Sequence, residues 1–487
     1  MTKVFKRIID LSDSPASLGV HIMHHLADYH DFVNSDYDLV HSERELIERF
    51  ILFKIETLNK LDYSKIANRA FVIILYELCA RLSLACAIRL ENILEGNHLD
   101  LGSRLKATQL FLIDIKRNSD FIDRYELICE LLENAYKHEE DDEIKVVNTF
   151  INYFICVLKN AHPNYIKQLI EKISVSIAEN KYMFLNKETF NRLIQINPNN
   201  VVESNNVIQR LFVETWNTSI IRENNKSEKN YETENNYLNK IQATDSTCNS
   251  IRQISLDTIN LLPANQRQDL YDALLRGVKP LATELELCAY MAFYMPMHYS
   301  KLKDAYEYLP KDFCSEDLEI YDWGCGQGIA TMALLENQNE INYNNIRSIT
   351  LLEPSQVALN RALINVEKFI SCASIVPICQ YLNDTNQTDF ENDINRNKLH
   401  LFSNIIDIEN FSLNNLLNLL VTNFKGLNYF VCVSPYIDDK KTARIDSFVD
   451  FFSANSSYRQ YCKIDERKGQ WIKQWTRVVR VFEVYIN

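Results

Sequence analysis

Three glycines lie close together in a chain that contains very few. The 487-residue sequence has nine glycines, and Gly324, Gly326 and Gly328 are three of them. They directly follow the apolar run from Leu318 to Asp322, which predicts a β-strand, and precede a segment with helical periodicity. Glycine adopts backbone conformations closed to other residues and lets a ligand approach the main chain. Because the free N–H groups of the next helix point back at such a turn, the sequence predicts a ligand-holding loop.

From Leu318 onward, short apolar runs alternate with amphipathic segments, which is the pattern of a doubly wound parallel sheet. The expected strands are LEIYD, SITLLE, ASIVPICQYL, LHLFSNI and LNYFVCVS, followed by Tyr458–Ile464 and RVVRVFEVYI. The last two are expected to form an antiparallel edge. We therefore predict an α-helical N-terminal region followed by an α/β Rossmann-like domain with a mostly parallel seven-stranded sheet.

The spacing of the glycines distinguishes between ligands. A dinucleotide-binding loop requires Gly-x-Gly-x-x-Gly, but Ile329 stands where its third glycine would be. The run DWGCGQG, from Asp322 to Gly328, instead resembles the acidic-x-Gly-x-Gly-x-Gly motif of class I S-adenosylmethionine-dependent methyltransferases. This family also has an acidic residue after its second strand, and Glu353 in SITLLEP has that place.

The resemblance covers the C-terminal domain only, and it implies that the cofactor is S-adenosylmethionine. It assigns Asp322 and the glycine loop to the methionine part of the cofactor, and Glu353 to the ribose hydroxyls. Asn383 or Asp384, which follow the third strand, would bind the adenine amino group.

The segment after the fourth strand lies where methyl donor and acceptor meet in this family. Ser403 and Asn404 are the predicted catalytic residues, and Asp407 follows them closely. Enzymes that methylate exocyclic amines of nucleic-acid bases usually have Asp/Asn/Ser-Pro-Pro-aromatic here, whereas this chain has SNII at 403–406. That target is therefore disfavoured. The later run SPY at 434–436 has one proline and is interpreted as a strand-ending turn.

The N-terminal half has apolar residues at helical spacing and few prolines or glycines. We predict an all-helical domain over residues 1–196, which would recognise a substrate or partner. Residues 197–252 are rich in Asn, Glu, Ser and Thr, which predicts a polar linker. Residues 253–487 would then contain a helical lead-in and the methyltransferase-like domain.

The charge balance restricts the partners. A formal net charge of -13 disfavours long duplex DNA, because phosphate contacts need a concentrated positive surface. A basic stretch from Arg459 to Arg480 is either a local contact face or a solvated rim beside an edge strand. The expected partner is an unknown macromolecular substrate, RNA or protein.

Other features argue against a membrane, secretion or a metal. The most apolar segment, Ala70 to Leu90, contains charged residues, so we expect a buried helix and no membrane partner. Twelve scattered cysteines without a Cys-x-x-Cys pair predict reduced thiols in a cytoplasmic protein. His21, His25 and Asp28 would share one helix face, but without an evident fourth ligand a polar surface is favoured and no metal site is predicted.

The sequence therefore predicts an S-adenosylmethionine-dependent methyltransferase with an unknown substrate. Two alternatives stay open: a sensor or scaffold that binds the cofactor without methyl transfer, and another reaction on the same cofactor. The layout of a helical region, an aromatic segment with Tyr290, Tyr294 and His298, and the glycine loop distantly resembles small-subunit ribosomal RNA methyltransferase-like proteins.

Overall fold

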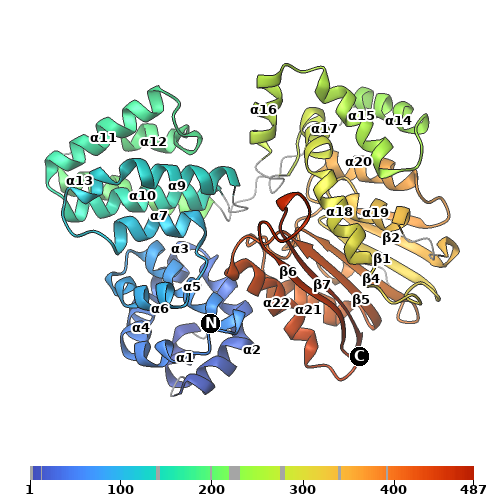
Figure 1. Ribbon diagram of the computed structural model, residues 1–487, viewed down its shortest axis with the longest axis horizontal. Coiled ribbons are helices and arrows are strands. Elements are labelled where there is room, and N and C mark those ends of the chain that lie inside the picture. Colours follow the sequence, from blue (N-terminus) through green and yellow to red (C-terminus); the bar gives the residue numbers. More distant parts are fainter. Residues whose placement is uncertain are drawn as a thin grey trace. The chain divides into compact units, whose positions relative to one another are not determined.

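The computed structural model describes residues 4–11, 14–138, 143–197, 200–218, 231–274, 280–337, 342–390 and 393–487. The chain divides into two compact units, which are described separately (Figure 1). Unit 1 comprises Met1–Glu223 together with Asp438–Ser447, and unit 2 comprises Asn224–Ile437 together with Phe448–Asn487.

Unit 1 is helical throughout its described residues and contains no strand there. Its helices are α1 (Val4–Leu11), α2 (Pro15–Val33), α3 (Tyr37–Ser42), α4 (Arg44–Asn59), α5 (Ile66–Leu82), η1 (Ala85–Leu90), α6 (Glu91–Gly96), α7 (Gly102–Leu112), α8 (Asp120–Asp123), α9 (Tyr125–His138), α10 (Glu143–Asn160), α11 (Pro163–Ala178), η2 (Met183–Leu185), α12 (Glu188–Leu193) and α13 (Val201–Thr218). Helix α5 is buried along most of its length, because its residues are apolar on nearly every side. Among the described helices, none is both long and apolar enough to span a membrane.

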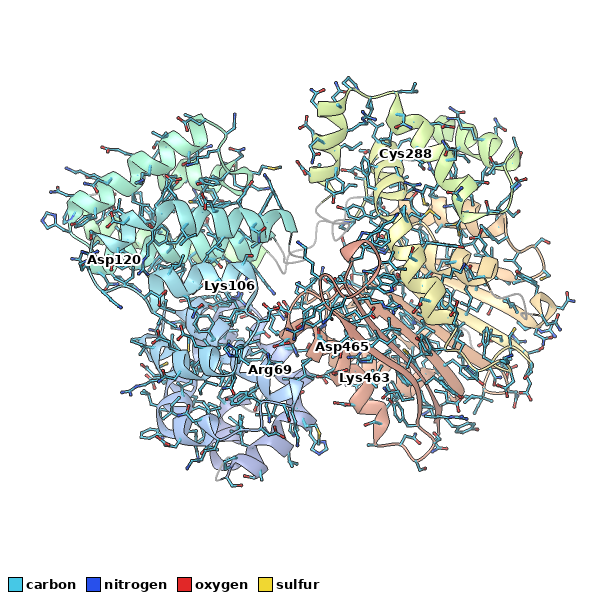
Figure 2. All side chains as sticks on the ribbon, in the orientation of Figure 1. Arg69, Lys106, Asp120, Cys288, Lys463 and Asp465 are labelled. Carbon is cyan, nitrogen blue, oxygen red and sulfur yellow. The ribbon has the colours of Figure 1, made fainter. Side chains whose placement is uncertain are left out.

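The segment Asp438–Ser447 reaches unit 1 from far along the chain. It forms the first part of helix α22 (Asp439–Ser453) and is almost completely buried. Lys440 Nζ donates to Glu77 Oε2 at 2.6 Å, and Arg104 donates to the other oxygen of Glu77 at 2.7 Å. Arg69, labelled in Figure 2, donates through Nε to Asp439 Oδ2 at 2.7 Å. Ion pairs therefore compensate the buried charges of this segment.

The structure differs from the sequence prediction over residues 197–252, where we expected a polar linker. Helix α13 lies there and belongs to unit 1, and Trp216 is fully buried. The Trp216 ring lies 3.5 Å below the Arg81 guanidinium, and its Nε1 donates to the Ser35 carbonyl at 3.0 Å. Eight of the 18 residues of α13 are apolar, and the buried ones, Ile208, Leu211, Phe212 and Trp216, fall on one helix face, so this part of the segment packs although the residues after it are polar. Residues 198–199 and 219–230 lie outside the described residues.

Unit 2 contains a seven-stranded sheet, which confirms the predicted fold (Figure 1). The strands are β1 (Leu318–Trp323), β2 (Ile346–Leu352), β3 (Ser374–Ile378), β4 (Asn397–Ser403), β5 (Gly426–Ser434), β6 (Arg459–Glu466) and β7 (Arg477–Ile486). Their order is β3-β2-β1-β4-β5-β7-β6. The first five strands of this order are parallel, and β7 is antiparallel to both of its neighbours.

Helices cover this sheet and lead into it. They are α14 (Tyr231–Gln242), α15 (Cys248–Asn260), α16 (Ala264–Ala273), α17 (Glu284–Phe293), α18 (Met295–Tyr306), α19 (Ile329–Asn337), η4 (Tyr343–Asn345), α20 (Gln356–Glu367), η5 (Gln387–Asp389), α21 (Leu413–Asn423), the second part of α22, and η6 (Ile472–Gln474). On one face of the sheet, residues such as Ile320 and Val431 pack in an aliphatic core with α18, α19 and α20. Because side chains alternate along a strand, the intervening residues form a separate layer on the other face.

That second layer is aromatic and contains a histidine. The His400 ring stacks on Phe430 at 4.7 Å, and Phe430 stacks on Phe482 at 4.7 Å. Trp323 Nε1 donates to His400 Nδ1 at 3.2 Å, and His400 Nε2 bonds with Asn428 Oδ1 at 2.9 Å. Burial lowers the pKa of His400 to about 3, so the ring is neutral and serves the packing of the sheet.

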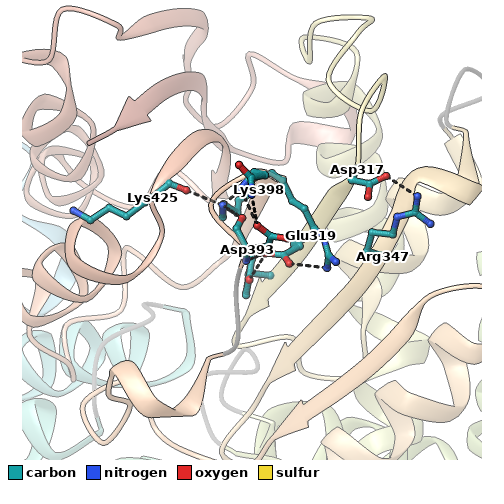
Figure 3. A network of polar contacts seen from close by, with 9 residues as sticks. Asp317, Glu319, Arg347, Asp393, Lys398 and Lys425 are labelled. Carbon is teal, nitrogen blue, oxygen red and sulfur yellow. Dashed lines mark hydrogen bonds and ion pairs between the residues drawn. The ribbon is translucent and has the colours of Figure 1, made fainter.

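The amino and carboxyl ends of the parallel strands differ in chemistry. At the amino ends of the parallel strands, Asp317 pairs with Arg347 at 2.7 Å, and Lys398 Nζ donates to three backbone carbonyls (Figure 3). The charged groups of this network bond to one another or to backbone carbonyls, and these bonds join neighbouring strands. At the opposite, carboxyl ends of the strands, the strand order reverses between β1 and β4, because the chain crosses from β3 to the far side of β1 before it forms β4. Ligands of doubly wound sheets bind at such a point.

Candidate functional site

The glycine loop lies at the carboxyl end of β1. Gly324, Gly326 and Gly328 have φ values of 65°, 53° and 79°, which favour glycine. A Cβ atom on Gly324 would lie 2.2 Å from Ile405 Cδ1, and one on Gly328 would lie 3.0 Å from Val366 Cγ2. At Gly326, a Cβ atom would meet nothing within 4 Å. Gly324 and Gly328 are therefore required for packing, whereas Gly326 leaves its main chain open to a ligand.

Glu353 follows β2 and faces this loop. Its Oε2 accepts a hydrogen bond from the Gly326 amide at 3.1 Å, and its Oε1 accepts one from the Ser355 amide at 3.0 Å. Burial raises the pKa of Glu353 to about 7, opposed by these two hydrogen bonds and supported by the charge of Asp322. Each carboxylate oxygen can accept a further bond. The carboxylate thus lies beside the loop, as the ribose-binding prediction requires.

Asp322 anchors the helix that follows the loop. Its Oδ2 accepts bonds from the Thr331 hydroxyl at 2.7 Å and from the Thr331 amide at 3.2 Å. Burial raises the pKa of Asp322 to about 6, while the bonds from Thr331 lower it. The first turn of α19 is therefore fixed against the end of β1. A contact between Asp322 and the cofactor stays a prediction.

The residues predicted to bind adenine are exposed. Asn383 Oδ1 accepts a hydrogen bond from the Ser412 amide at 2.8 Å, just before α21, and Asp384 lies at the surface. Gln380, two residues after the end of β3, was not predicted from the sequence. Its Oε1 is buried and has no hydrogen-bond partner among the described residues. An amide oxygen in that state can accept a bond from a ligand amine.

Asn404 follows the end of β4 in a strained conformation. Its φ of 57° lies in the left-handed region, and its amide donates to the Val433 carbonyl at 2.7 Å. Its Nδ2 donates to Ser403 Oγ at 3.1 Å and to His298 Nδ1. Its Oδ1 is buried, without a partner among the described residues. The two predicted catalytic residues, Ser403 and Asn404, thus form a polar pair at the end of β4. Backbone strain of this kind is common at functional sites, and a catalytic role for the pair stays a prediction.

Two further buried groups lie beside this pair. Burial, together with the charge of Lys301, lowers the pKa of His298 on α18 to about 3. Asp407 Oδ1 accepts a bond from Ser434 Oγ at 2.5 Å. Within the described residues, His298 Nε2 and Asp407 Oδ2 have no hydrogen-bond partner. The ends of β4 and β5 therefore offer polar atoms that a bound molecule can satisfy.

The lead-in helices hold the glycine loop in place. Gln327 Nε2 donates to the Leu287 carbonyl of α17 at 2.9 Å. The Tyr290 ring lies 5.3 Å from Tyr294 and 5.8 Å from His298, measured between ring centroids. The aromatic segment thus connects the glycine loop to the end of β4, where His298 contacts Asn404.

On the histidine-rich face of α2, His21 and His25 bond to other side chains of the same helix. His21 Nε2 bonds with the Tyr29 hydroxyl at 3.1 Å, and His25 Nδ1 bonds with Asp28 at 2.8 Å. Over the part of the chain that the structure describes, no group of three or more His, Cys, Asp or Glu side chains could hold a metal ion.

Comparisons with known proteins find similarity in solved structures but not in sequence. No protein-family model matches the chain, and no curated protein matches it with significance. A precorrin-6y C5,15-methyltransferase from Geobacter metallireducens is 17% identical, with 39% of this chain and 86% of that chain covered and a TM-score of 0.24. A SAM-dependent methyltransferase from Leishmania major is 12% identical, with 44% and 82% covered and a TM-score of 0.26.

A third solved structure, the plantazolicin methyltransferase BpumL in complex with SAH, is 10% identical to this chain. The alignment covers 48% of this chain and 100% of that chain, with a TM-score of 0.28.

Proposed function

We propose that unit 2 binds S-adenosylmethionine and transfers its methyl group to an acceptor. The observation that carries this proposal is the hydrogen bond between the Glu353 carboxylate and the Gly326 amide, beside open space at Gly326. A carboxylate at the end of the second strand suits two ribose hydroxyls, and a bare main chain suits close approach of the amino-acid part.

The other residues have supporting roles in this proposal. Asp322 holds α19 so that its amino terminus, the positive end of the helix dipole, faces the carboxylate of the methionine part. Gln380 Oε1 accepts a bond from the adenine amine, with Asn383 and Asp384 as the alternatives predicted from the sequence.

At the acceptor side, orientation is the main contribution of the protein. The bound cofactor supplies an activated methyl group, so alignment of the acceptor can account for several kcal/mol of the barrier. Asn404 presents Oδ1 to the acceptor, and Ser403 and His298 hold the amide of Asn404. With a pKa of about 3, His298 is too weak a base to remove a proton near neutral pH. We propose a macromolecular acceptor, RNA or protein.

Calorimetry with S-adenosylmethionine and S-adenosylhomocysteine tests the cofactor assignment. We expect Glu353→Ala to weaken both affinities at least about tenfold, because hydrogen bonds to a charged group contribute about 1.5–3 kcal/mol. Asp317→Ala is the control, because this carboxylate pairs with Arg347 at the amino ends of the strands (Figure 3), whereas Glu353 lies at their carboxyl ends. Unchanged binding by Glu353→Ala would remove the ribose assignment.

Transfer of labelled methyl groups into fractionated RNA, protein and metabolites tests catalysis. We expect label in a macromolecular fraction. Label in none of the fractions, with cofactor binding intact, would favour the sensor alternative.

A further inference from the structure

The loop of residues 467–476 joins β6 to β7 and combines positive charge with aromatic rings. Its sequence, RKGQWIKQWT, contains three basic residues and two tryptophans but no acidic residue, in a chain whose net charge is -13. Arg467, Lys468 and Lys473 are exposed, while Trp471 and Trp475 are half-buried. This loop is therefore a local positive and aromatic surface.

The sheet register places this loop at the edge where the candidate site lies. Val478, at the start of β7, pairs with Ser434, at the end of β5. The Tyr436 amide donates to Thr476 Oγ1 at 3.0 Å, and the Arg467 guanidinium lies 4.7 Å from the Tyr436 ring centroid. The loop thus begins beside β5, on the acceptor side of the site, and not beside β2 with Glu353.

Not every basic residue of the C-terminal stretch is available for a partner. Arg477 pairs with Glu466 at 2.5 Å and with Asp304, and buried Arg480 pairs with Asp465 at 2.7 Å. Figure 2 labels Asp465 together with Lys463 on β6. These arginines stabilise the hairpin, whereas Lys468 and Lys473 of the loop are exposed to solvent.

The cations and rings of the loop are arranged together. The Arg477 guanidinium lies 4.3 Å from the Trp471 ring centroid and supports that ring from a buried position. Lys473 Nζ lies 5.1 Å from the Trp475 ring, and Lys473 adopts a left-handed φ of 52°. The two indole rings are 6.4 Å apart. A flat ring with an adjacent cation can stack on a base and contact its phosphate.

We propose that the 467–476 loop binds a single-stranded nucleic acid and delivers one of its bases or sugars to the acceptor side of the site. This inference rests on the proposed function and names its substrate class. Bases with exposed faces stack on aromatic side chains, and phosphates bind the nearby cations. A duplex hides its base faces, and an acidic protein surface would need the cations but not the tryptophans.

Fluorescence anisotropy with labelled single-stranded RNA and DNA of about 12 nucleotides, a length within the usual site sizes of single-strand binders, tests the proposal without cofactor. We expect binding at low salt, with a matched duplex and an acidic peptide at least about tenfold weaker. Tighter binding of RNA or of DNA identifies the natural strand. Trp475→Ala should weaken binding about tenfold, because one base stack contributes about 1–3 kcal/mol. Trp475→Phe should retain most of the affinity, because it keeps a ring.

Charge variants give a second readout. Lys468→Gln with Lys473→Gln should weaken binding and reduce its salt dependence, because fewer counterions are released. Lys240→Gln, an exposed lysine on α14, is the matched control and should change neither quantity. Absence of single-strand binding, or equal binding of the duplex or the peptide, would overturn the inference. Calorimetry with S-adenosylmethionine on the same samples reports separately on the proposed function.

Discussion

Alanine variants of Gly326 and Gly469 distinguish the free-energy cost of an unfavourable backbone conformation from the loss of a ligand contact. Both have positive φ, 53° and 87°, and neither would place a Cβ atom within 4 Å of another group. Alanine at either position should cost about 1–2 kcal/mol of folding free energy, seen in thermal unfolding. We expect only Gly326→Ala to lose affinity for S-adenosylmethionine, at least about tenfold by calorimetry, because its methyl group would occupy the approach to the main chain. Equal affinities for the two variants would contradict this role.

Glu353 should make cofactor binding depend on pH. Its pKa of about 7 in the free protein means that binding as a carboxylate requires loss of a proton at lower pH. The affinity should therefore be constant above about pH 7. Well below this pH, it should decrease about tenfold for each pH unit. The stability effect has the opposite direction. Because folding raises this pKa from 4.5, ionisation of Glu353 reduces stability as the pH rises from 4.5 to about 7. Calorimetry of Glu353→Gln should lack the pH dependence of binding.

The sequence predicts the positions of some candidate residues better than those of others. The loop glycines and Glu353 lie close together at the ends of neighbouring strands, as expected from local spacing after those strands, and their contact with a cofactor stays a prediction. Gln380 was not predicted, because the burial of one amide oxygen depends on the surrounding fold. The bond between Asn404 and His298 joins residues 106 positions apart, so neither residue reveals it alone.

Helix α17 should transmit its own stability to the glycine loop. Thr283 and Glu286 form a capping box at its amino end, and the Leu287 carbonyl accepts a bond from Gln327 in the loop. Thr283→Ala should cost about 1 kcal/mol and also weaken S-adenosylmethionine binding, as measured by unfolding and calorimetry. Ser14→Ala removes a similar capping box from α2 in unit 1 and should lower stability alone. A loss of affinity in both variants would indicate a general effect.

At the scale of elements, regular patterns were more predictable than sparse ones. The seven strands and the antiparallel edge follow from short apolar runs, whereas the order of the strands comes from the structure alone. Helix α13 was missed because its eight apolar residues were averaged with the polar residues that follow it in the 197–252 window. Composition averages over a window and does not report the apolar face of a single helix.

At the scale of the whole molecule, the buried ion pairs of Glu77 with Arg104 and Lys440 contribute to the stability of unit 1. Lys440→Met removes one cation that bonds to buried Glu77 and keeps Arg104, so we expect a loss of about 2 kcal/mol, less than for a fully unpaired buried charge. Lys106→Met is the matched control, because Lys106 is exposed and lies 3.8 Å from Asp100. It should change stability by less than about 1 kcal/mol in chemical denaturation. Similar losses for the two variants would show that Lys440 is not needed to neutralise Glu77.

The origin of Lys440 has a consequence for the order of events on the ribosome. Glu77 and Lys440 are 363 residues apart, so translation of five strands separates the acid from this cation. A nascent N-terminal unit must hold the Glu77 carboxylate without Lys440 until residues 438–447 emerge. Its final consolidation is therefore a late step of biosynthesis, although its own helices are made first.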